Sequence, residues 1–175
     1  MISSRSILGR LIAVAVMSVM VASATAQGVV SELTVSSVVK QRSGEEQLAP
    51  VQSVKPGDLL QYSATYRNDG KQAVKRLAAT LPIPFGTEFV GASAVPGNVL
   101  ASVGGQVFEP VPLMRKVKRP DGQVVDAPVP LAEYRAVRWP ERELAAGATY
   151  VTSVRVRVTS AEGPALVAVA ASAPH

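Results

Sequence analysis

The chain has 175 residues, with 18 lysines and arginines, 13 acidic residues, one histidine and no cysteine. The lack of cysteine excludes disulfides, thiolate metal sites, thiol catalysis and lipid attachment to a cysteine at an export cleavage site. The net charge is +5, but two of the arginines lie in residues 1–26, and the remaining 16 basic and 13 acidic residues give +3, which is too small to indicate nucleic-acid binding. The only histidine, His175, stands last in the sequence, a poor place to hold a catalytic or metal-binding imidazole.

Residues 1–26 have the pattern of a secretory signal peptide. Two arginines precede an apolar run over residues 11–21, and small residues follow at Ala24 and Ala26. The run is shorter than the roughly 20 residues that a membrane-spanning helix needs. We therefore predict cleavage after Ala26, a mature N-terminus at Gln27, and a product that is exported to the periplasm, the medium or the cell surface. No later segment is apolar for long enough to span a membrane.

The clearest strand is predicted over residues 59–67 (LLQYSATYR). Its apolar and aromatic residues recur at every second position, which is the pattern of a half-buried strand. The turn sequences Pro-Gly-Asp and Asn-Asp-Gly stand before and after it, at residues 56–58 and 68–70.

Similar alternation predicts strands in the second half of the chain, over residues 149–159 and 134–139. Residues 71–81 fit less well, because Lys75 has the parity of the apolar positions, and a bulge or an edge position would resolve the conflict. Ten residues are predicted to be buried in the core: Leu60, Tyr62, Ala64, Leu77, Leu81, Phe89, Val137, Trp139, Val154 and Val156.

Weaker patterns add further strands. Residues 31–40 align Leu33, Val35 and Val39 on one face; residues 87–90 form a short strand; and Gly104-Gly105 indicates a hairpin between residues 99–103 and 106–108. Seven or eight strands with regularly spaced turns predict an all-β protein, a single antiparallel β-sandwich.

The predicted organisation has four parts. Residues 1–26 are the signal peptide, residues 27–47 an N-terminal strand and linker, residues 48–159 the sandwich, and residues 160–175 an Ala-rich tail that forms a last strand or frays. Within the sandwich, the proline-rich and basic residues 110–133 are interpreted as a long connection, and a hairpin around Asp121-Gly122 is left open.

Several of these blocks resemble a known family. The Pro-Gly-Asp turn, the strand with Tyr62 and Tyr66 and the Asn-Asp-Gly turn are followed by LPIPFGTEFV at residues 81–90 and LAAG at residues 144–147. This order resembles the bacterial domain of unknown function 11, a family of secreted and cell-surface modules, over roughly residues 48–159. The resemblance implies an immunoglobulin-like sandwich outside the cell. The chain departs from the family in having one copy and in its basic stretch over residues 110–133.

Acidic residues are the remaining candidates for chemistry. Glu45, Glu46, Glu141 and Glu143 lie in turn or loop patterns, where solvation or capping is the ordinary role. A calcium loop and a phosphate-binding glycine loop are both missing from the sequence. We predict no catalytic residue, no cofactor and no metal; a small hydrolase that uses loop carboxylates such as Glu141 and Glu143 is the least favoured alternative.

Arginines supply the candidate binding surface. If their strands share one sheet of an immunoglobulin-like sandwich, four arginines form one exposed face: Arg76, Arg138, Arg155 and Arg157. A basic stretch within residues 110–133 adds further cations: Arg115, Lys116, Lys118 and Arg119. Such a face would bind an anionic envelope polymer or an acidic protein partner, or would simply be a solvated surface that keeps the sheet from pairing.

The expected function is therefore an exported, non-catalytic binding or structural module of the bacterial cell envelope, with no nucleic-acid partner. The alternative is an accessory subunit or chaperone that pairs with its partner by β-strand addition.

Overall fold

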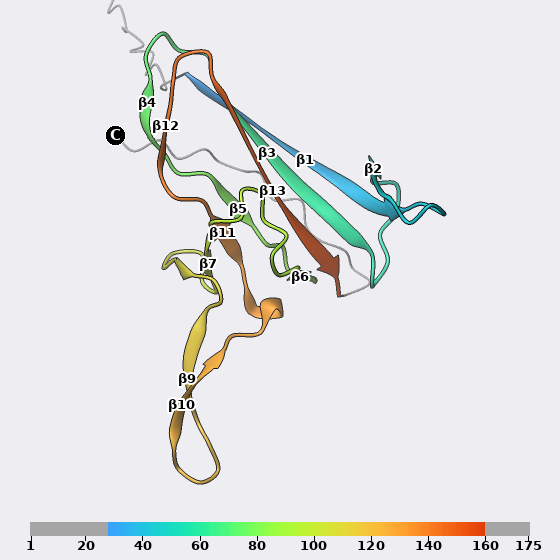
Figure 1. Ribbon diagram of the computed structural model, residues 1–175, viewed down its shortest axis with the longest axis vertical. Helices are drawn as coiled ribbons and strands as arrows, with labels where there is room; N and C mark the ends of the chain where they lie inside the picture. Colours follow the sequence, from blue (N-terminus) through green and yellow to red (C-terminus); the bar gives the residue numbers. More distant parts are fainter. Residues whose placement is uncertain (1–27, 160–175) are drawn as a thin grey trace, which may run out of the picture.

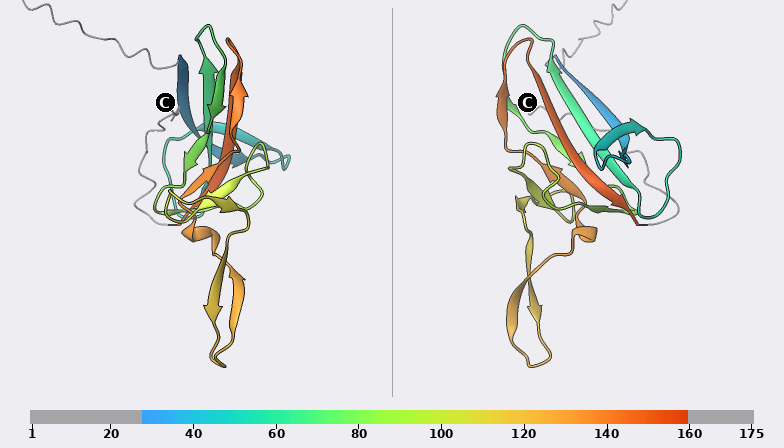
Figure 2. Two further views of the ribbon diagram at one scale, coloured as in Figure 1. Left: turned by 90° about the vertical axis from the view of Figure 1, so that its left-hand side faces the viewer. Right: turned by 45° about the vertical axis from the view of Figure 1, so that its right-hand side comes forward.

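The computed structural model describes residues 28–159, which form an all-β structure of several antiparallel sheets (Figures 1 and 2). Within this part of the chain there is one short 3-10 helix, η1 (Leu131–Glu133), and no α-helix, and no helix there is long and apolar enough to cross a membrane. The predicted signal peptide, its cleavage site at Ala26 and Gln27, and the tail over residues 160–175 lie outside the described residues.

The largest sheet has five strands in the order β2-β1-β3-β13-β6. Their bounds are β1 (Val29–Lys40), β2 (Glu46–Pro50), β3 (Leu59–Asn68), β6 (Thr87–Phe89) and β13 (Thr149–Val158). The central strand β3 pairs along its length with β1 on one side and with β13 on the other. This sheet continues across the expected boundary between residues 47 and 48, because β1 and β2 both pair within it.

Three smaller sheets complete the described structure. A four-stranded sheet has the order β5-β11-β7-β8, and two further sheets have two strands each, β12 with β4 and β10 with β9. Their bounds are β4 (Val74–Leu77), β5 (Thr80–Pro82), β7 (Leu100–Ser102), β8 (Glu109–Pro110), β9 (Met114–Lys118), β10 (Val124–Pro128), β11 (Ala136–Arg138) and β12 (Arg142–Leu144).

One cluster of buried residues joins the five-stranded sheet to β4, β5, β7, β11 and β12. All ten residues predicted for the core are buried, with 0–1% of their surface exposed, so that prediction is confirmed. Trp139 is fully enclosed, and its indole N–H donates a 2.7 Å hydrogen bond to the carbonyl oxygen of Pro96. Period-two alternation therefore assigned the inward faces of β3 and β13 correctly.

Several boundaries differ from the predictions. Residues 71–81 form two strands in different sheets, β4 and β5, so the single predicted strand is wrong. Lys75 is exposed in β4, whose buried residues Val74 and Leu77 are three positions apart. The pairing of β4 with β12 shifts register between Arg142 and Leu144, so an irregularity of the expected kind resolves the conflict of parity. Such breaks, together with strands inside the expected long connection, raise the number of strands: residues 28–159 form β1 to β13, where seven or eight strands were expected.

Two smaller expectations were also wrong. β7 and β8 pair as the Gly104-Gly105 signal predicted, but residues 106–108 belong to the connecting loop and form no strand. The hydroxyl of Ser102 organises this loop by accepting hydrogen bonds from the backbone N–H groups of both glycines, at 3.2 and 2.8 Å. Val39, aligned with Leu33 and Val35 by the sequence pattern, does not pack against the core as they do: it is 47% exposed and lies at the end of β1 that pairs with β2.

Candidate functional site

A two-stranded hairpin projects from the body of the protein, at the bottom of Figure 1 and in both views of Figure 2. It consists of β9 and β10, paired from Met114 with Pro128 to Lys118 with Val124. Hydrogen bonds from the N–H of Arg119 to the oxygen of Gln123 (2.8 Å) and from the N–H of Gly122 to the oxygen of Arg119 (2.9 Å) close its turn. Gly122 has a φ of 86°, which glycine adopts without strain. The hairpin that the sequence left open at Asp121-Gly122 is therefore present.

The root of this hairpin is fixed to the core. Leu113 and Val129, the pair before β9 and after β10, are both buried, and the N–H of Val129 donates to the oxygen of Leu113 at 2.8 Å. The N–H of Leu113 in turn donates to the hydroxyl of Tyr134 at 2.8 Å. Tyr134 is fully buried and stacks on Phe89 of β6, with ring centroids 5.8 Å apart. The hairpin therefore leaves the body from an anchored position.

The hairpin's surface combines cations with exposed apolar side chains. Two of its four cations are in ion pairs at its sides, Arg115 with Glu133 at 2.7 Å and Lys116 with Asp126 at 3.1 Å. Lys118 and Arg119 have no ion pair within residues 28–159 and stand at the far end, next to the turn. Exposed apolar residues accompany them: Met114, Val117 and Val124.

A hollow of about 220 Å³ lies at the root of the hairpin, and we call it the root hollow. Its apolar lining includes Val103, Val107, Leu113, Met114 and Val129. Its charged lining consists of Glu109, Arg115 and Glu133. The hollow lies between the β7–β8 loop and the start of β9, two segments that the sequence analysis did not connect with a binding site.

The four predicted surface arginines do not share a sheet, so that expectation is wrong. Arg76 lies in β4, Arg138 in β11, and Arg155 and Arg157 in β13, three strands that belong to three different sheets. The expected order of strands in the sandwich therefore does not apply to β4, β11 and β13.

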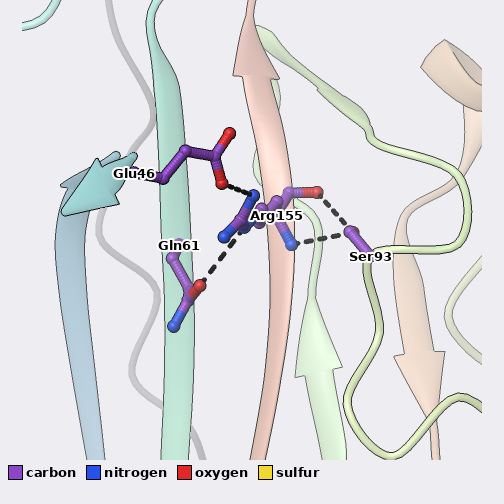
Figure 3. Close-up of polar contacts among 4 residues, drawn as sticks. All are labelled: Glu46, Gln61, Ser93 and Arg155. Atoms are coloured by element: carbon purple, nitrogen blue, oxygen red, sulfur yellow. Dashed lines mark hydrogen bonds and ion pairs between the residues drawn. The ribbon is translucent and has the colours of Figure 1, made fainter. Parts of the chain in front are cut away.

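Arg155 is held by its neighbours on the five-stranded sheet (Figure 3). Its guanidinium donates to the carboxylate of Glu46 at 2.6 Å and to the amide oxygen of Gln61 at 3.3 Å. Its backbone N–H donates to the hydroxyl of Ser93 at 3.0 Å, and that hydroxyl donates to the backbone oxygen of Arg155 at 3.3 Å. These contacts tie β2, β3, β13 and the loop after β6 together, which is a structural role.

The other arginines also have intramolecular contacts. The guanidinium of Arg138 lies 3.8 Å from the ring centroid of Phe108. Arg157 donates to the backbone oxygen of Gly57 at 3.4 Å. Arg76 forms two hydrogen bonds with Glu141, at 2.8 and 3.2 Å.

The acidic residues considered for chemistry lie in two places: Glu45 and Glu46 at the start of β2, and Glu141 and Glu143 at β12, which belongs to another sheet. The hydrogen bond from Arg76 holds the pKa of Glu141 below its usual range, and a carboxyl that stays ionised is poorly suited to act as a general acid. Within the described part of the chain, no group of three or more histidine, cysteine, aspartate or glutamate residues could hold a metal ion.

Comparisons with protein-family models, curated proteins and solved structures found no match to this chain.

Proposed function

We propose that this chain is an exported, non-catalytic interaction module of the bacterial cell envelope, which binds its partner through the β9–β10 hairpin. The observation that supports the proposal most strongly is the projection of this hairpin from the body (Figure 2). A two-stranded ribbon is only marginally stable in water by itself, because it has no core to bury. Here residues 114–128 form such a ribbon and expose Met114, Val117 and Val124 to solvent. Surface of this kind gains burial when it meets a partner.

The body that carries the hairpin is proposed to be an immunoglobulin-like sandwich of the domain of unknown function 11 family. Support comes from the places of the family-like residues. Asp58 accepts a hydrogen bond from the N–H of Lys55 at 2.8 Å and closes the turn before β3. Buried Asn68 ends β3, and its side-chain amide donates to the oxygens of Gln72 and Leu144, at 2.8 and 3.0 Å. Both residues thus specify the fold rather than a ligand.

A second candidate function is strand addition to the five-stranded sheet, as in an accessory subunit or chaperone. β2 pairs with β1 only from Ser36 to Lys40, so within the described residues the outer edge of Val29–Val35 has no partner. This edge contains no lysine or proline, the residues that usually protect an edge strand. It differs from the hairpin in location, so variants can separate the two functions.

Export and envelope binding are tested on the expressed full-length chain. Mass spectrometry of the exported product should give an N-terminus at Gln27, and a product that retains residues 11–21 would contradict export.

Binding is tested with a shortened hairpin. Residues 116–126 are replaced by Asn-Gly, which joins the paired residues Arg115 and Ala127 by a two-residue turn. The shortened variant should keep the stability of the wild type, because its buried residues are unchanged, and should lose association with isolated envelope fractions. Association equal to that of the wild type would show that the hairpin is not the contact.

A further inference from the structure

We infer that the root hollow and β9 form one docking surface for an acidic, extended segment of a partner protein, which places a single apolar side chain in the hollow. The inference rests on the proposed function of the hairpin and specifies the chemistry of its partner. It combines three properties of the described residues: the size of the hollow, the open edge of β9 and the distribution of charge along the hairpin.

The root hollow has the size of a site for one side chain. Its volume of about 220 Å³ is below the roughly 300–1,000 Å³ of small-molecule pockets. Three of its apolar lining residues are exposed, Val103 by 50%, Val107 by 74% and Met114 by 49%. Exposed apolar residues around one hollow favour an apolar anchor from a partner, which is the usual centre of a protein interface.

The edge of β9 can accept an extended segment. The hydrogen bonds between Val129 and Leu113 and between Arg119 and Gln123 fix which backbone groups face β10. Odd-numbered residues of β9 point their N–H and C=O groups toward β10, so those of Met114, Lys116 and Lys118 point away from it. β9 pairs only with β10 in its sheet. A partner strand would extend the ladder on this side, beginning at Met114, next to the hollow.

The charge along this edge selects an acidic partner. β9 has three cations in five residues, and Arg119 follows directly. Two of these cations, Lys116 and Arg115, are in ion pairs with Asp126 and Glu133, whereas Lys118 and Arg119 have no ion pair within residues 28–159. Glutamate or aspartate on an added strand would lie beside Lys118, where opposite charges across neighbouring strands stabilise the pairing.

A second copy of this chain fits the surface poorly. Antiparallel pairing of two β9 strands about Lys116 would place Lys116 opposite itself and Met114 opposite Lys118. Like charges directly opposite each other destabilise a pair of strands. An anionic polymer would satisfy the cations and leave the root hollow without an apolar side chain. Both are outcomes that the experiment distinguishes from the acidic segment.

The test uses the mature chain and three fluorescein-labelled peptides. The first has one leucine followed by glutamates that alternate with threonines; the second replaces the leucine with alanine; the third replaces the glutamates with lysines. Fluorescence anisotropy should show that the first peptide binds and that its binding weakens at high salt. The other two peptides should bind at least about tenfold more weakly, a difference of ~1.4 kcal/mol in binding free energy.

Two variants, each with a matched control, locate the binding. Lys118→Glu with Arg119→Glu should weaken binding of the first peptide at least about tenfold. Lys40→Glu with Arg42→Glu makes the same change of charge at the β1–β2 turn and should have little effect on this binding. Val107→Asp in the hollow should weaken binding of the first peptide as much as the hairpin variant does. Val151→Asp, at an exposed valine of β13 that belongs to neither candidate surface, should have little effect.

Each contrary outcome overturns the inference. The first is no binding of the acidic peptide, or equal binding of the lysine peptide. The second is dimerisation of the free chain that Lys118→Glu with Arg119→Glu abolishes, which would identify a second copy as the occupant. The third is binding of an anionic polysaccharide or of phosphatidylglycerol vesicles without binding of the peptide. If the shortened hairpin loses envelope association while the acidic peptide fails to bind, the proposed function stands and the inference about its partner fails.

Discussion

Three buried tyrosines allow a test of hydrogen bonding in the core, because one atom is removed from each and three different results are expected. The hydroxyl of Tyr134 accepts the N–H of Leu113 at 2.8 Å, at the root of the hairpin. The hydroxyl of Tyr66 contacts the backbone oxygen of Thr80 at 3.5 Å, and the hydroxyl of Tyr62 is buried without a partner among the described residues. All three side chains are fully enclosed.

The expected free energies of unfolding follow from these contacts. Tyr134→Phe leaves the N–H of Leu113 buried without an acceptor, which costs about 1–3 kcal/mol. For a domain of this size that loss lowers the melting temperature by about 3–12 °C. Tyr66→Phe removes only a long contact and should change stability by less than about 0.5 kcal/mol. Tyr62→Phe removes a polar group that is buried without compensation, so the variant should be unchanged or about 1 kcal/mol more stable.

Urea unfolding followed by Trp139 fluorescence gives the three free energies, and amide hydrogen exchange adds a local measurement. Exchange at Leu113 and Val129 should accelerate in Tyr134→Phe below the global unfolding limit, and should stay unchanged in the other two variants. The reasoning is refuted if Tyr62→Phe loses as much stability as Tyr134→Phe. It is also refuted if Tyr134→Phe unfolds like the wild type with an unchanged hairpin root.

Two further predictions concern the core. Trp139→Ala should lose about 3–5 kcal/mol through lost burial and a cavity, measured by urea unfolding followed by circular dichroism because the variant has no tryptophan. Val151→Ala, at an exposed position of β13, should stay within about 0.5 kcal/mol, and similar losses in both variants would contradict the burial of Trp139. Burial raises the pKa of the Tyr62 hydroxyl above its usual value near 10. The folded state therefore keeps its full stability with respect to this group below about pH 10 and loses stability as the pH rises through the pKa of the folded state. Alkaline pH should destabilise the wild type more than Tyr62→Phe, and identical plots of stability against pH would show that Tyr62 does not take part.

The inward faces of the long strands could be predicted from the sequence, and their grouping into sheets could not. Successive side chains of a strand point to opposite faces, so the inward positions show in the sequence as apolar residues at every second place. β3 and β13 have this pattern over ten residues each. Which strands pair depends on contacts between distant segments, and the sequence does not display these. Residues 71–81 show the difference: Leu77 and Leu81 are both buried as predicted, yet they belong to strands of different sheets.

The hairpin was harder to predict for a physical reason. Alternation arises in a sequence because one face of a strand is buried, and β9 and β10 have no core beneath them. Their sequences, MRKVK and VVDAP, therefore show no period of two, and the turn at Asp121-Gly122 and the surrounding cations are the only local signals. A ribbon outside the core is free of the packing constraints that select side chains inside it. If the hairpin binds as we propose, the residues of β9 are selected by the partner that they meet, and an acidic partner would select the cations of β9.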